Sequence, residues 1–398
     1  MGGYAIVFAV AVLTTLIATP LVRKLVTRIG AIVPPNPRGV HTKAMPTLGG
    51  AAMFVGFLLA MAVASQIGQF RDMFNGSSEP AGLMLAAGVM FAVGALDDLR
   101  DVSPPAKIAG MVLAGSLLSL FGISMLFFRV PFAGQDTLVL SADLAPLVTV
   151  LVVVVFANAI NLIDGLDGLA AGIVIIAGSA LFLYSDRLFK DGFLEGDNIA
   201  PLVAVIAVGI CVGFLPYNFN PARIFMGDAG ALFLGLLLAT TTITIGGHAD
   251  YQYPGTTYFF YAPLFIPIVI LGVPIIDTAF SVVRRAVRGR SFAVADKDHL
   301  HHRLMRLGHG PRRTVVILWL WTALLSSLAL LPTYTQSGNL NALVPIGVMA
   351  LALVLYAFFF PGRREGRADP EAKNLTEAEA PAELGDVVDL DSRRRDIS

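Results

Sequence analysis

Long apolar segments recur along almost the whole chain of 398 residues, and they limit the folds that the sequence can adopt. Most are close to the ~20 apolar residues that an α-helix needs to cross the hydrocarbon core of a bilayer. Only 14% of the residues are charged, whereas a soluble domain carries roughly a quarter. The sequence therefore predicts an all-α polytopic membrane protein. About eleven transmembrane helices are expected, near residues 4–22, 48–68, 80–96, 106–128, 144–161, 168–184, 199–217, 229–245, 260–283, 314–332 and 341–360.

The distribution of lysine and arginine predicts how these helices are oriented. When alternate connections are assigned to opposite sides of the membrane, one side receives all but four of the 28 basic residues. The exceptions are Arg71, Arg129, Arg187 and Lys190. Because basic residues are retained on the cytoplasmic side, the N-terminus is predicted to lie outside and the C-terminus in the cytoplasm.

Two parts of the chain do not read as membrane spans. Between Arg129 and Asp143, the alternating stretch that begins at Thr137 predicts a small external β-hairpin. The last residues combine acidic and basic side chains with proline and almost no aromatic residues, so they cannot bury a core. We therefore expect an integral membrane domain over 1–361 and a disordered cytoplasmic tail over 362–398. The formal net charge of zero argues against a nucleic acid partner.

Polar residues interrupt the apolar pattern at the predicted cytoplasmic ends of several spans. Asp97 and Asp98 close the third span, and a carboxylate in hydrocarbon costs roughly 3 kcal/mol unless a cation, a proton or a watery cleft accompanies it. Asn161, Asp164 and Asp167 follow the fifth span at a spacing of three, so a helical continuation would place them on one face. A solvated helix end and a capped helix junction are the structural alternatives for these two groups.

A third polar group opens the eighth span. Asn218 precedes this span, and Asp228 stands beside Gly227 and Gly230 where a helix begins. Asp228 can be interpreted as the N-cap of that helix or as a hard oxygen ligand for a divalent metal.

Two basic groups lie in predicted cytoplasmic loops. His299, His301, His302 and Arg303 form a dense cluster that suits contacts to phosphate or sugar, with a zinc site as the competing interpretation. Carboxylates elsewhere and the absence of a cysteine pair favour magnesium over zinc. Lys43, ahead of the second span, is either a phosphate contact or a lysine that fixes topology.

Together these groups favour phosphoryl transfer, in which positioning and charge neutralisation do most of the work. Mg²⁺ would offset the charge on pyrophosphate oxygens. The sequence contains no GxxxxGK[ST] motif, which excludes a P-loop enzyme. A secondary transporter with intramembrane carboxylates is the alternative from another class. It predicts polar residues near the bilayer midplane, preferably in matching repeats, whereas here they gather at one face. Finding Asp97, Asp164 and Asp228 far apart, or lining a pore, would favour it.

The order of the motifs resembles the polyprenyl-phosphate N-acetylhexosamine-1-phosphate transferase family, glycosyltransferase family 4. The resemblance runs from about Lys43 to Arg303. It is carried by Pro46-Thr-Leu-Gly-Gly, Asp97-Asp98, Asn161-Leu-Ile-Asp-Gly-Leu-Asp-Gly, Phe225-Met-Gly-Asp-Ala-Gly and the histidine cluster.

The resemblance implies transfer of a sugar-1-phosphate from a UDP-sugar to a polyprenyl phosphate. It places the active site on the cytoplasmic face of a bacterial cytoplasmic (inner) membrane, with Mg²⁺ as the cofactor and Mn²⁺ as a substitute. It implies that Asp228 binds the metal, with Asp98 as a second candidate, and that Asp97 deprotonates or orients the lipid phosphate, with Asp98 beside it. The residues implied to bind substrate are Lys43, Asn161, Asp164, Asp167, Asn218, His299, His301, His302 and Arg303.

The histidine cluster resembles the branch of the family that uses N-acetylglucosamine. The expected reaction therefore takes UDP-GlcNAc and undecaprenyl or decaprenyl phosphate, releases UMP and forms polyprenyl-pyrophosphoryl-GlcNAc, which initiates a cell-envelope polysaccharide. The alternative is the phospho-MurNAc-pentapeptide transferase of peptidoglycan synthesis. Direct attack by the lipid phosphate is the expected mechanism, because carboxylates are the only other evident nucleophiles, and an aspartyl intermediate is the alternative. The sequence leaves open whether the protein forms a homodimer.

Overall fold

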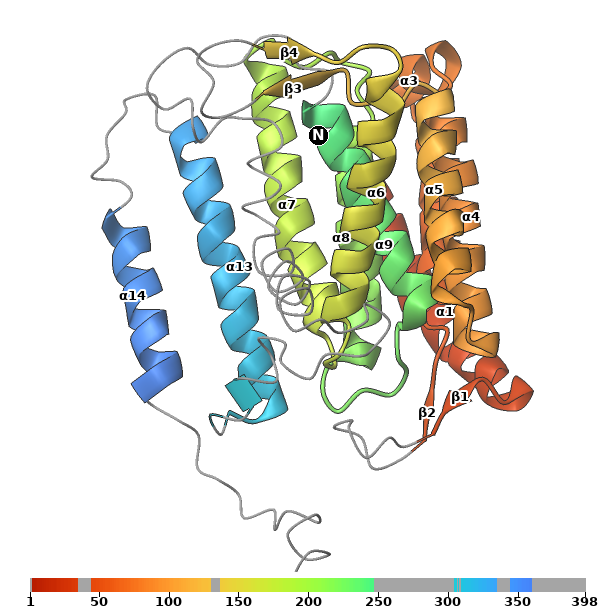
Figure 1. The fold of residues 1–398 in the computed structure, drawn as a ribbon, viewed down its shortest axis with the longest axis vertical. Coiled ribbons are helices and arrows are strands. Elements are labelled where there is room, and N and C mark those ends of the chain that lie inside the picture. The colour runs from red at the N-terminus through yellow and green to blue at the C-terminus, as the bar shows by residue number, and fades with distance from the viewer. Residues whose placement is uncertain are drawn as a thin grey trace, which may run out of the picture. The chain divides into compact units, whose positions relative to one another are not determined.

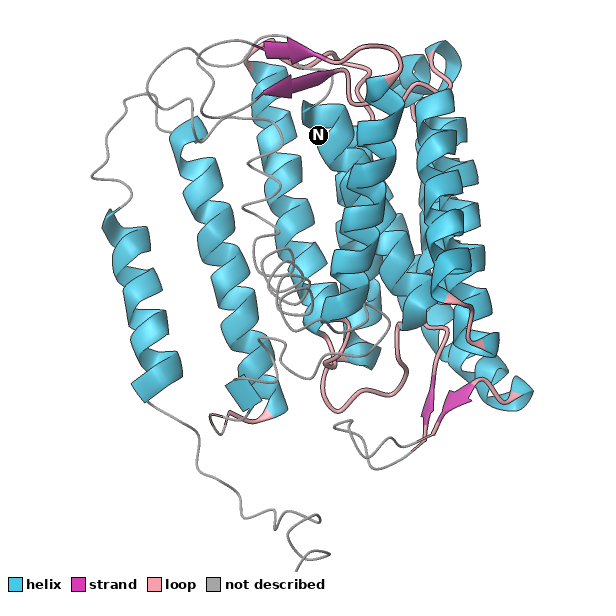
Figure 2. Ribbon diagram, in the orientation of Figure 1, coloured by secondary structure: helices cyan, strands magenta, loops and turns pink. Residues whose placement is uncertain are grey.

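The computed structural model describes residues 2–34, 44–129, 137–246, 304–305, 307, 309–334 and 344–359. Most of these residues lie in helices that run up and down the membrane-embedded unit (Figure 1). The helices are α1 (Gly2–Ile29), α2 (Gly50–Ala64), α3 (Arg71–Gly76), α4 (Glu79–Arg100), α5 (Pro104–Leu120), α6 (Leu144–Ile163), α7 (Leu169–Lys190), α8 (Ala200–Asn218), α9 (Gly227–Gly246), α13 (Pro311–Tyr334) and α14 (Val344–Phe359). Two short hairpins lie at opposite ends of the helices (Figure 2). They are β1 (Ile32–Val33) with β2 (Met45–Pro46), and β3 (Phe127–Arg129) with β4 (Thr137–Val139).

Seven described helices are long and apolar enough to cross a membrane, namely α1, α4, α6, α7, α8, α9 and α13. An eighth span results if α2 and α3 count as one, since they are joined through a 3₁₀ turn and bent by 89°. Helices α5 and α14 are apolar but shorter. Because helices satisfy their own backbone hydrogen bonds, this composition makes the described chain a multi-pass, all-α membrane protein.

Every predicted span except 260–283 overlaps a described helix, and 260–283 lies outside the described residues. The fourth span ends earlier than predicted, at Leu120. Gly122 follows with a φ of +100°, which glycine adopts without a Cβ clash, and turns the chain toward β3. The predicted external hairpin is confirmed as a hairpin, because β3 pairs antiparallel with β4 and the backbone of Phe127 is in register with that of Val139. The sidedness of the termini stays a prediction, as does the tail 362–398, which lies outside the described residues.

Helix α9 is enclosed by its neighbours. Its residues from Ala229 to Gly246 are all buried, and it packs mainly against α4 and α6, with α8 and α2 also in contact. A helix that is apolar all round is stable when it is surrounded by protein or lipid. Since α9 has no polar face to orient it, its position depends on how closely the neighbouring helices fit it.

Glycines let two helices approach the first turn of α9. A Cβ atom on Gly50 of α2 would lie 2.2 Å from the backbone nitrogen of Gly230. A Cβ atom on Gly94 of α4 would lie 2.4 Å from the carbonyl oxygen of Asp228. Small residues allow such close backbone approach between membrane helices. The last turns of α4 are therefore brought directly against the start of α9.

A Gly94→Ala substitution is expected to destabilise the protein by about 1–3 kcal/mol, because the new methyl group forces the backbones of α4 and α9 apart. Gly88→Ala on the same helix is the matched control, since no atom lies within 4 Å of its new Cβ. That variant should gain up to about 1 kcal/mol from helix propensity. The measurement is the apparent Tm of each protein in detergent, and equal Tm values would contradict the close contact at Gly94.

Candidate active site

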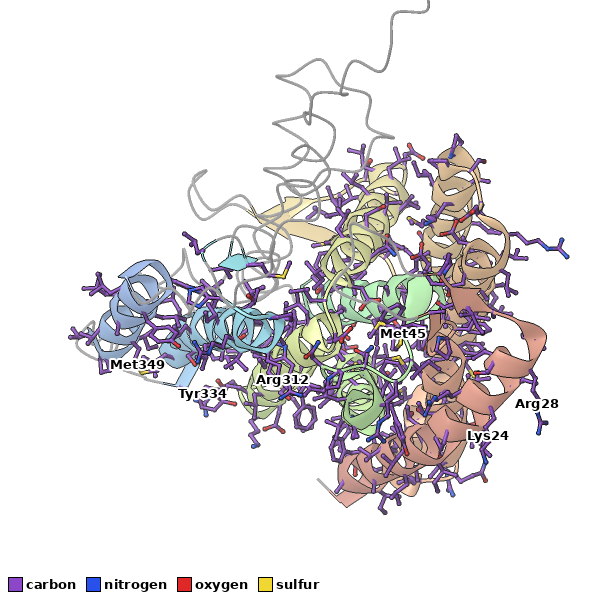
Figure 3. The ribbon with its side chains drawn as sticks, turned by 90° about the horizontal axis from the view of Figure 1, so that it is seen from below. Lys24, Arg28, Met45, Arg312, Tyr334 and Met349 are labelled. Atoms are coloured by element: carbon purple, nitrogen blue, oxygen red, sulfur yellow. The ribbon has the colours of Figure 1, made fainter. Side chains whose placement is uncertain are left out.

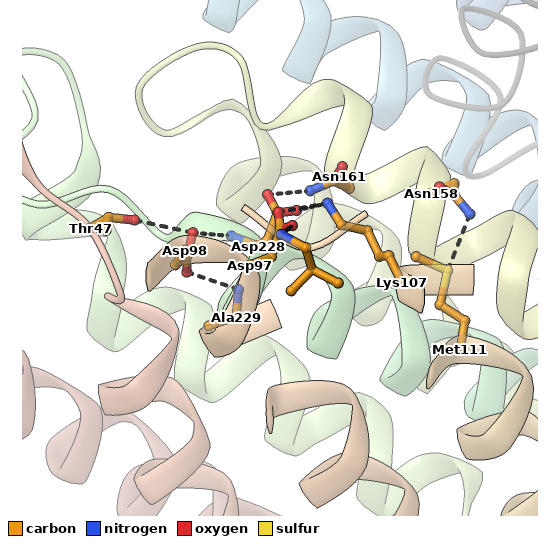
Figure 4. A network of polar contacts seen from close by, with 10 residues as sticks. Thr47, Asp97, Asp98, Lys107, Met111, Asn158, Asn161, Asp228 and Ala229 are labelled. Carbon is orange, nitrogen blue, oxygen red and sulfur yellow. Dashed lines mark hydrogen bonds and ion pairs between the residues drawn. The ribbon is translucent and has the colours of Figure 1, made fainter. Parts of the chain in front are cut away.

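Five polar side chains from four helices converge at the start of α9 (Figure 4). Helices α4 and α6 end here, whereas α5 and α9 begin here, so up-and-down packing brings four helix termini together. The residues are Asp97 and Asp98 from α4, Lys107 from α5, Asn161 from α6 and Asp228 from α9.

Asp98 binds the N-terminus of α9. Its Oδ1 accepts a hydrogen bond from the backbone nitrogen of Asp228 at 2.9 Å, and its Oδ2 accepts one from Ala229 at 3.1 Å. The hydroxyl of Thr47 donates to Oδ1 at 3.3 Å. The first amide groups of a helix have no partner within it and carry partial positive charge, so a carboxylate stabilises them. The interpretation of Asp228 as the N-cap is therefore wrong. Helix α9 begins before Asp228, and its first amide groups donate their hydrogen bonds to Asp98 from another helix.

Lys107 connects the carboxylates of Asp97 and Asp228. Its ammonium lies 2.8 Å from Asp97 Oδ2 and also contacts Asp228 Oδ2. The amide of Asn161 donates to Asp228 Oδ1 at 2.8 Å, and the backbone nitrogen of Val102 donates to Asp97 Oδ1 at 2.9 Å. Both carboxylates are thus fixed in orientation. All three charged side chains keep about a fifth of their surface exposed, so the cluster is accessible.

Asp164 follows α6 at the edge of this cluster and is half-buried. Burial is the main cause that raises the pKa of its carboxyl well above the usual value, and the negative charges of Asp228, Asp98 and Asp167 raise it further. Within the described part of the chain, Lys107 is the only cation that contacts the cluster. The site therefore carries an excess of negative charge that favours a further cation.

The donor set fits Mg²⁺. Asp97 and Asp228 offer hard carboxylate oxygens, and Asn161 is already within hydrogen-bonding distance of Asp228. Among the described residues, no three acidic, histidine or cysteine side chains are grouped as a complete ligand set. Mg²⁺ is commonly held by one or two carboxylates and completed by substrate phosphates and water, so Asp97 and Asp228 could hold it without a third protein carboxylate. In this structure, Lys107 is the cation that Asp97 and Asp228 share.

Asp167 and Asn218 join the two loops that flank the cluster. Asp167 Oδ2 accepts hydrogen bonds at 2.9 Å from the side chain of Asn220 and from the backbone nitrogen of Ala222. Asn218 accepts from Gly168 at 3.0 Å and donates to the carbonyl of Ile224 at 3.1 Å. Both side chains are buried, at 7% and 2% exposure. These two residues hold the loops after α6 and after α8 in one arrangement.

Comparison with known proteins gives consistent results. The family model described as glycosyl transferase family 4 matches residues 80–246. A decaprenyl-phosphate N-acetylglucosaminephosphotransferase of Mycobacterium tuberculosis (strain ATCC 25618 / H37Rv) is 35% identical over 362 residues, which are 88% of this chain and 89% of that protein. The chain belongs to glycosyl transferase family 4. A probable undecaprenyl-phosphate N-acetylglucosaminyl 1-phosphate transferase of Bacillus subtilis (strain 168) is 37% identical over 79% of this chain and 81% of its own length. An undecaprenyl-phosphate alpha-N-acetylglucosaminyl 1-phosphate transferase of Escherichia coli (strain K12) is 27% identical, with 85% of each chain covered.

The structure of this family 4 member groups part of the predicted site. Asp97, Asp98, Asn161 and Asp228 are in contact through the network above, and Asp164 adjoins them. Asp97, Asp164 and Asp228 are therefore not far apart, and their separation is one arrangement that would have favoured the transporter alternative. Asp167 lies in the loop after α6, and Asn218 is the last residue of α8. The remaining predicted site residues lie outside the described residues; they are Lys43, His299, His301, His302 and Arg303.

Lys107 was missed by the sequence reasoning. In the sequence, Lys107 counted only among the basic residues that predict topology. The signal that could have found it is its position, since it is the one charged residue of a helix that begins shortly after Asp97 and Asp98. An isolated charge in an apolar helix near two carboxylates favours an ion pair.

A Lys107→Met substitution should make the stability of the protein more dependent on Mg²⁺. Without the ammonium, Asp97 and Asp228 have no shared cation, so the folded protein gains more from a bound divalent ion. A ligand at 100 times its Kd adds about 2.7 kcal/mol to the folded state. The measurement is apparent Tm against MgCl₂ concentration. The control is Lys190→Met, which removes an exposed lysine that pairs with Asp186 at 2.7 Å. If Tm responds identically to Mg²⁺ in the parent and both variants, Lys107 does not substitute for a divalent ion between Asp97 and Asp228.

An Asp164→Asn substitution should raise the stability of the metal-free protein at alkaline pH. A carboxyl whose pKa is raised by folding lowers stability progressively as pH rises from its unfolded pKa of about 3.9 through its folded pKa. Asparagine removes that titration. The apparent Tm of the variant, measured with a chelator, should exceed that of the parent near pH 8, and the difference should shrink toward pH 4. A difference that does not change with pH would refute the assignment.

Proposed function

We propose that this family 4 member transfers GlcNAc-1-phosphate from UDP-GlcNAc to a polyprenyl phosphate, releasing UMP and forming polyprenyl-pyrophosphoryl-GlcNAc. The observation that carries the proposal is the cluster of Asp97, Asp228 and Lys107 at the helix termini of a multi-pass membrane protein. Such a cluster presents both signs of charge, which phosphoryl transfer between a nucleotide sugar and a membrane lipid requires.

The names of the relatives support the donor. Those from Mycobacterium tuberculosis, Bacillus subtilis and Escherichia coli are all named for N-acetylglucosamine transfer. They favour UDP-GlcNAc over the muramyl-pentapeptide donor. Their names differ in the acceptor, decaprenyl phosphate or undecaprenyl phosphate, so the proposal covers both. The reaction product would initiate a cell-envelope polysaccharide.

The proposed reaction is a direct displacement at phosphorus. An oxygen of the polyprenyl phosphate attacks the β-phosphorus of UDP-GlcNAc, the bond from that phosphorus to the bridging oxygen breaks, and UMP leaves with the bridging oxygen. Asp97 would orient the attacking phosphate or accept its proton, because its carboxylate is about a fifth exposed and lies beside the ammonium of Lys107. Lys107, already placed between two carboxylates, would turn its ammonium toward the phosphate charge that enters the site.

The contacts of Asp98 support direct displacement over an aspartyl intermediate. Both of its oxygens accept hydrogen bonds from the start of α9, and Thr47 adds a third. A carboxylate engaged in this way is a weaker nucleophile, and a covalent bond to phosphorus would remove the partner of two helix amides. Asp98 is therefore proposed to position α9 and, through it, Asp228.

Asp228 is the proposed protein ligand for Mg²⁺, with Asp97 and the Asn161 amide beside it. The ion, when bound, offsets negative charge on the pyrophosphate oxygens. Asp164 would affect the net negative charge beside Asp228 through its protonation state. Asp167 and Asn218 would act indirectly, by fixing the loops after α6 and after α8. Lys43, His299, His301, His302 and Arg303 remain proposed substrate contacts on the basis of the sequence, and Mn²⁺ a proposed substitute metal.

The active site is proposed to face the cytoplasm of a bacterial cell, with the N-terminus outside. The support is the bias of basic residues toward the connections at the same end as the site. UDP-sugars are cytoplasmic substrates in this scheme, and the acceptor phosphate would enter from the adjoining leaflet.

The decisive experiment follows UMP release by the purified full-length protein with UDP-GlcNAc, polyprenyl phosphate and MgCl₂. An Asp228→Asn variant should lose about 100-fold or more in kcat, since it removes the main charge that would hold the metal. Asp186→Asn is the matched control, because Asp186 lies near the end of α7 that is far from the cluster, where it pairs with Lys190. This control should retain the parent rate.

Three results would contradict the proposal. UMP release that occurs only with UDP-MurNAc-pentapeptide would move the protein to the peptidoglycan branch. Full activity in the presence of a chelator would contradict the proposed role of Mg²⁺. Full activity in a folded Asp228→Asn variant would contradict the proposed role of Asp228 as the metal ligand.

A further inference from the structure

A groove of about 350 Å³ lies between α13 and α14. Its walls are mainly apolar, and two arginines stand at the end where α13 begins. The lining residues are Arg312, Arg313, Val316, Ile317, Leu320, Leu353 and Tyr356. Figure 3, which looks from the end that carries the active site, labels Arg312 beside α13 at that end. The groove therefore combines an apolar channel with a cationic mouth at the predicted cytoplasmic border of the membrane.

The two guanidinium groups are available to an anion. Both side chains are exposed. Among the described residues, Arg312 makes one hydrogen bond, from Nε to the carbonyl of Asn220 at 2.9 Å, and Arg313 makes none. A guanidinium beside apolar side chains at a membrane border matches a lipid that has a phosphate head and a hydrocarbon tail.

We propose that this groove binds one anionic phospholipid of the surrounding bilayer. The phosphate contacts Arg312 and Arg313, and an acyl chain lies along Val316 and Leu320 of α13 and Leu353 of α14. Basic pockets between membrane helices on the cytoplasmic side are typical sites for such head groups.

The position of the groove favours a resident phospholipid over the prenyl acceptor. Helix α13 packs against α7 on one side and against α14 on the other. The groove is on the α14 side, whereas the cluster of Asp97 and Asp228 is built by α4, α5, α6 and α9. Figure 1 shows the same order of helices from α14 through α13 to α7. An acceptor phosphate held here would be separated from that cluster by α13.

The head group would also support the loops beside the active site. Arg312 holds the carbonyl of Asn220, and the side chain of Asn220 donates to Asp167. Farther along α13, the Trp319 indole donates to the carbonyl of Leu169 at 3.3 Å and packs against Gly172. A phosphate that fixes Arg312 therefore fixes the segment that bonds Asp167. This second part, a gain in activity from the lipid, rests on the proposed function.

Native mass spectrometry of the full-length protein with added phosphatidylglycerol tests the binding itself. Arg313→Gln is the informative variant, because Arg313 makes no hydrogen bond in the described part of the chain that the substitution would break. Its affinity for one phosphatidylglycerol should fall about fivefold. The control is Lys24→Gln, an exposed lysine of α1 seen at the same end but well apart from Arg312 (Figure 3). The control should bind as the parent does.

Equal binding by the parent and Arg313→Gln would overturn the proposal, as would equal affinity for phosphatidylcholine. Displacement of phosphatidylglycerol from the parent by polyprenyl phosphate, at equal concentration, would overturn the choice of occupant. UMP release in nanodiscs of phosphatidylcholine, with and without phosphatidylglycerol, then tests the link to activity. Because binding is measured without turnover, failure of the lipid site and failure of the proposed reaction give different results.

Discussion

The carboxylate of Asp98 holds the first turn of α9, and the position of the other polar groups in the site depends on that contact. Helix α9 is buried from Ala229 to Gly246, so its first amide groups gain from a partner within the protein. Asp98 satisfies two of them from α4, and Gly94, one turn earlier, lets the two backbones meet. This contact places Asp228 within reach of Lys107 and Asn161.

Charge balance is the second constraint. Carboxylates gathered near hydrocarbon are costly unless positive charge accompanies them. Lys107 supplies one positive charge to Asp97 and Asp228, and Asp164 has its pKa raised by burial and by its neighbours. Among the described residues the site has more carboxylates than cations, which fits the proposed reaction of Mg²⁺ and highly charged phosphates. In the proposed reaction, the ammonium of Lys107 that joins the two carboxylates would also contact phosphate.

The loops around the cluster are held by a different set of contacts. Asp167 and Asn218 join the loop after α6 to the loop after α8, and α13 adds Arg312 and Trp319 from outside. These residues make hydrogen bonds within the protein, so their effect on any reaction would pass through loop position. The lipid groove on the outer side of α13 would extend this support into the bilayer.

The sequence by itself determined that the chain is a helical membrane protein, because apolar segments of membrane-spanning length leave no other way to satisfy the backbone. It also determined which side chains are candidates for chemistry, since Asp97, Asp98 and Asp228 are conspicuous in an apolar chain. The sequence did not determine which role each of these three aspartates has. Asp98 proved to cap a helix that is distant in sequence, and Lys107 proved to bind two carboxylates from other helices. Only the tertiary structure decided this, because hydrogen bonds and ion pairs depend on distances between helices, which local spacing along the chain does not specify.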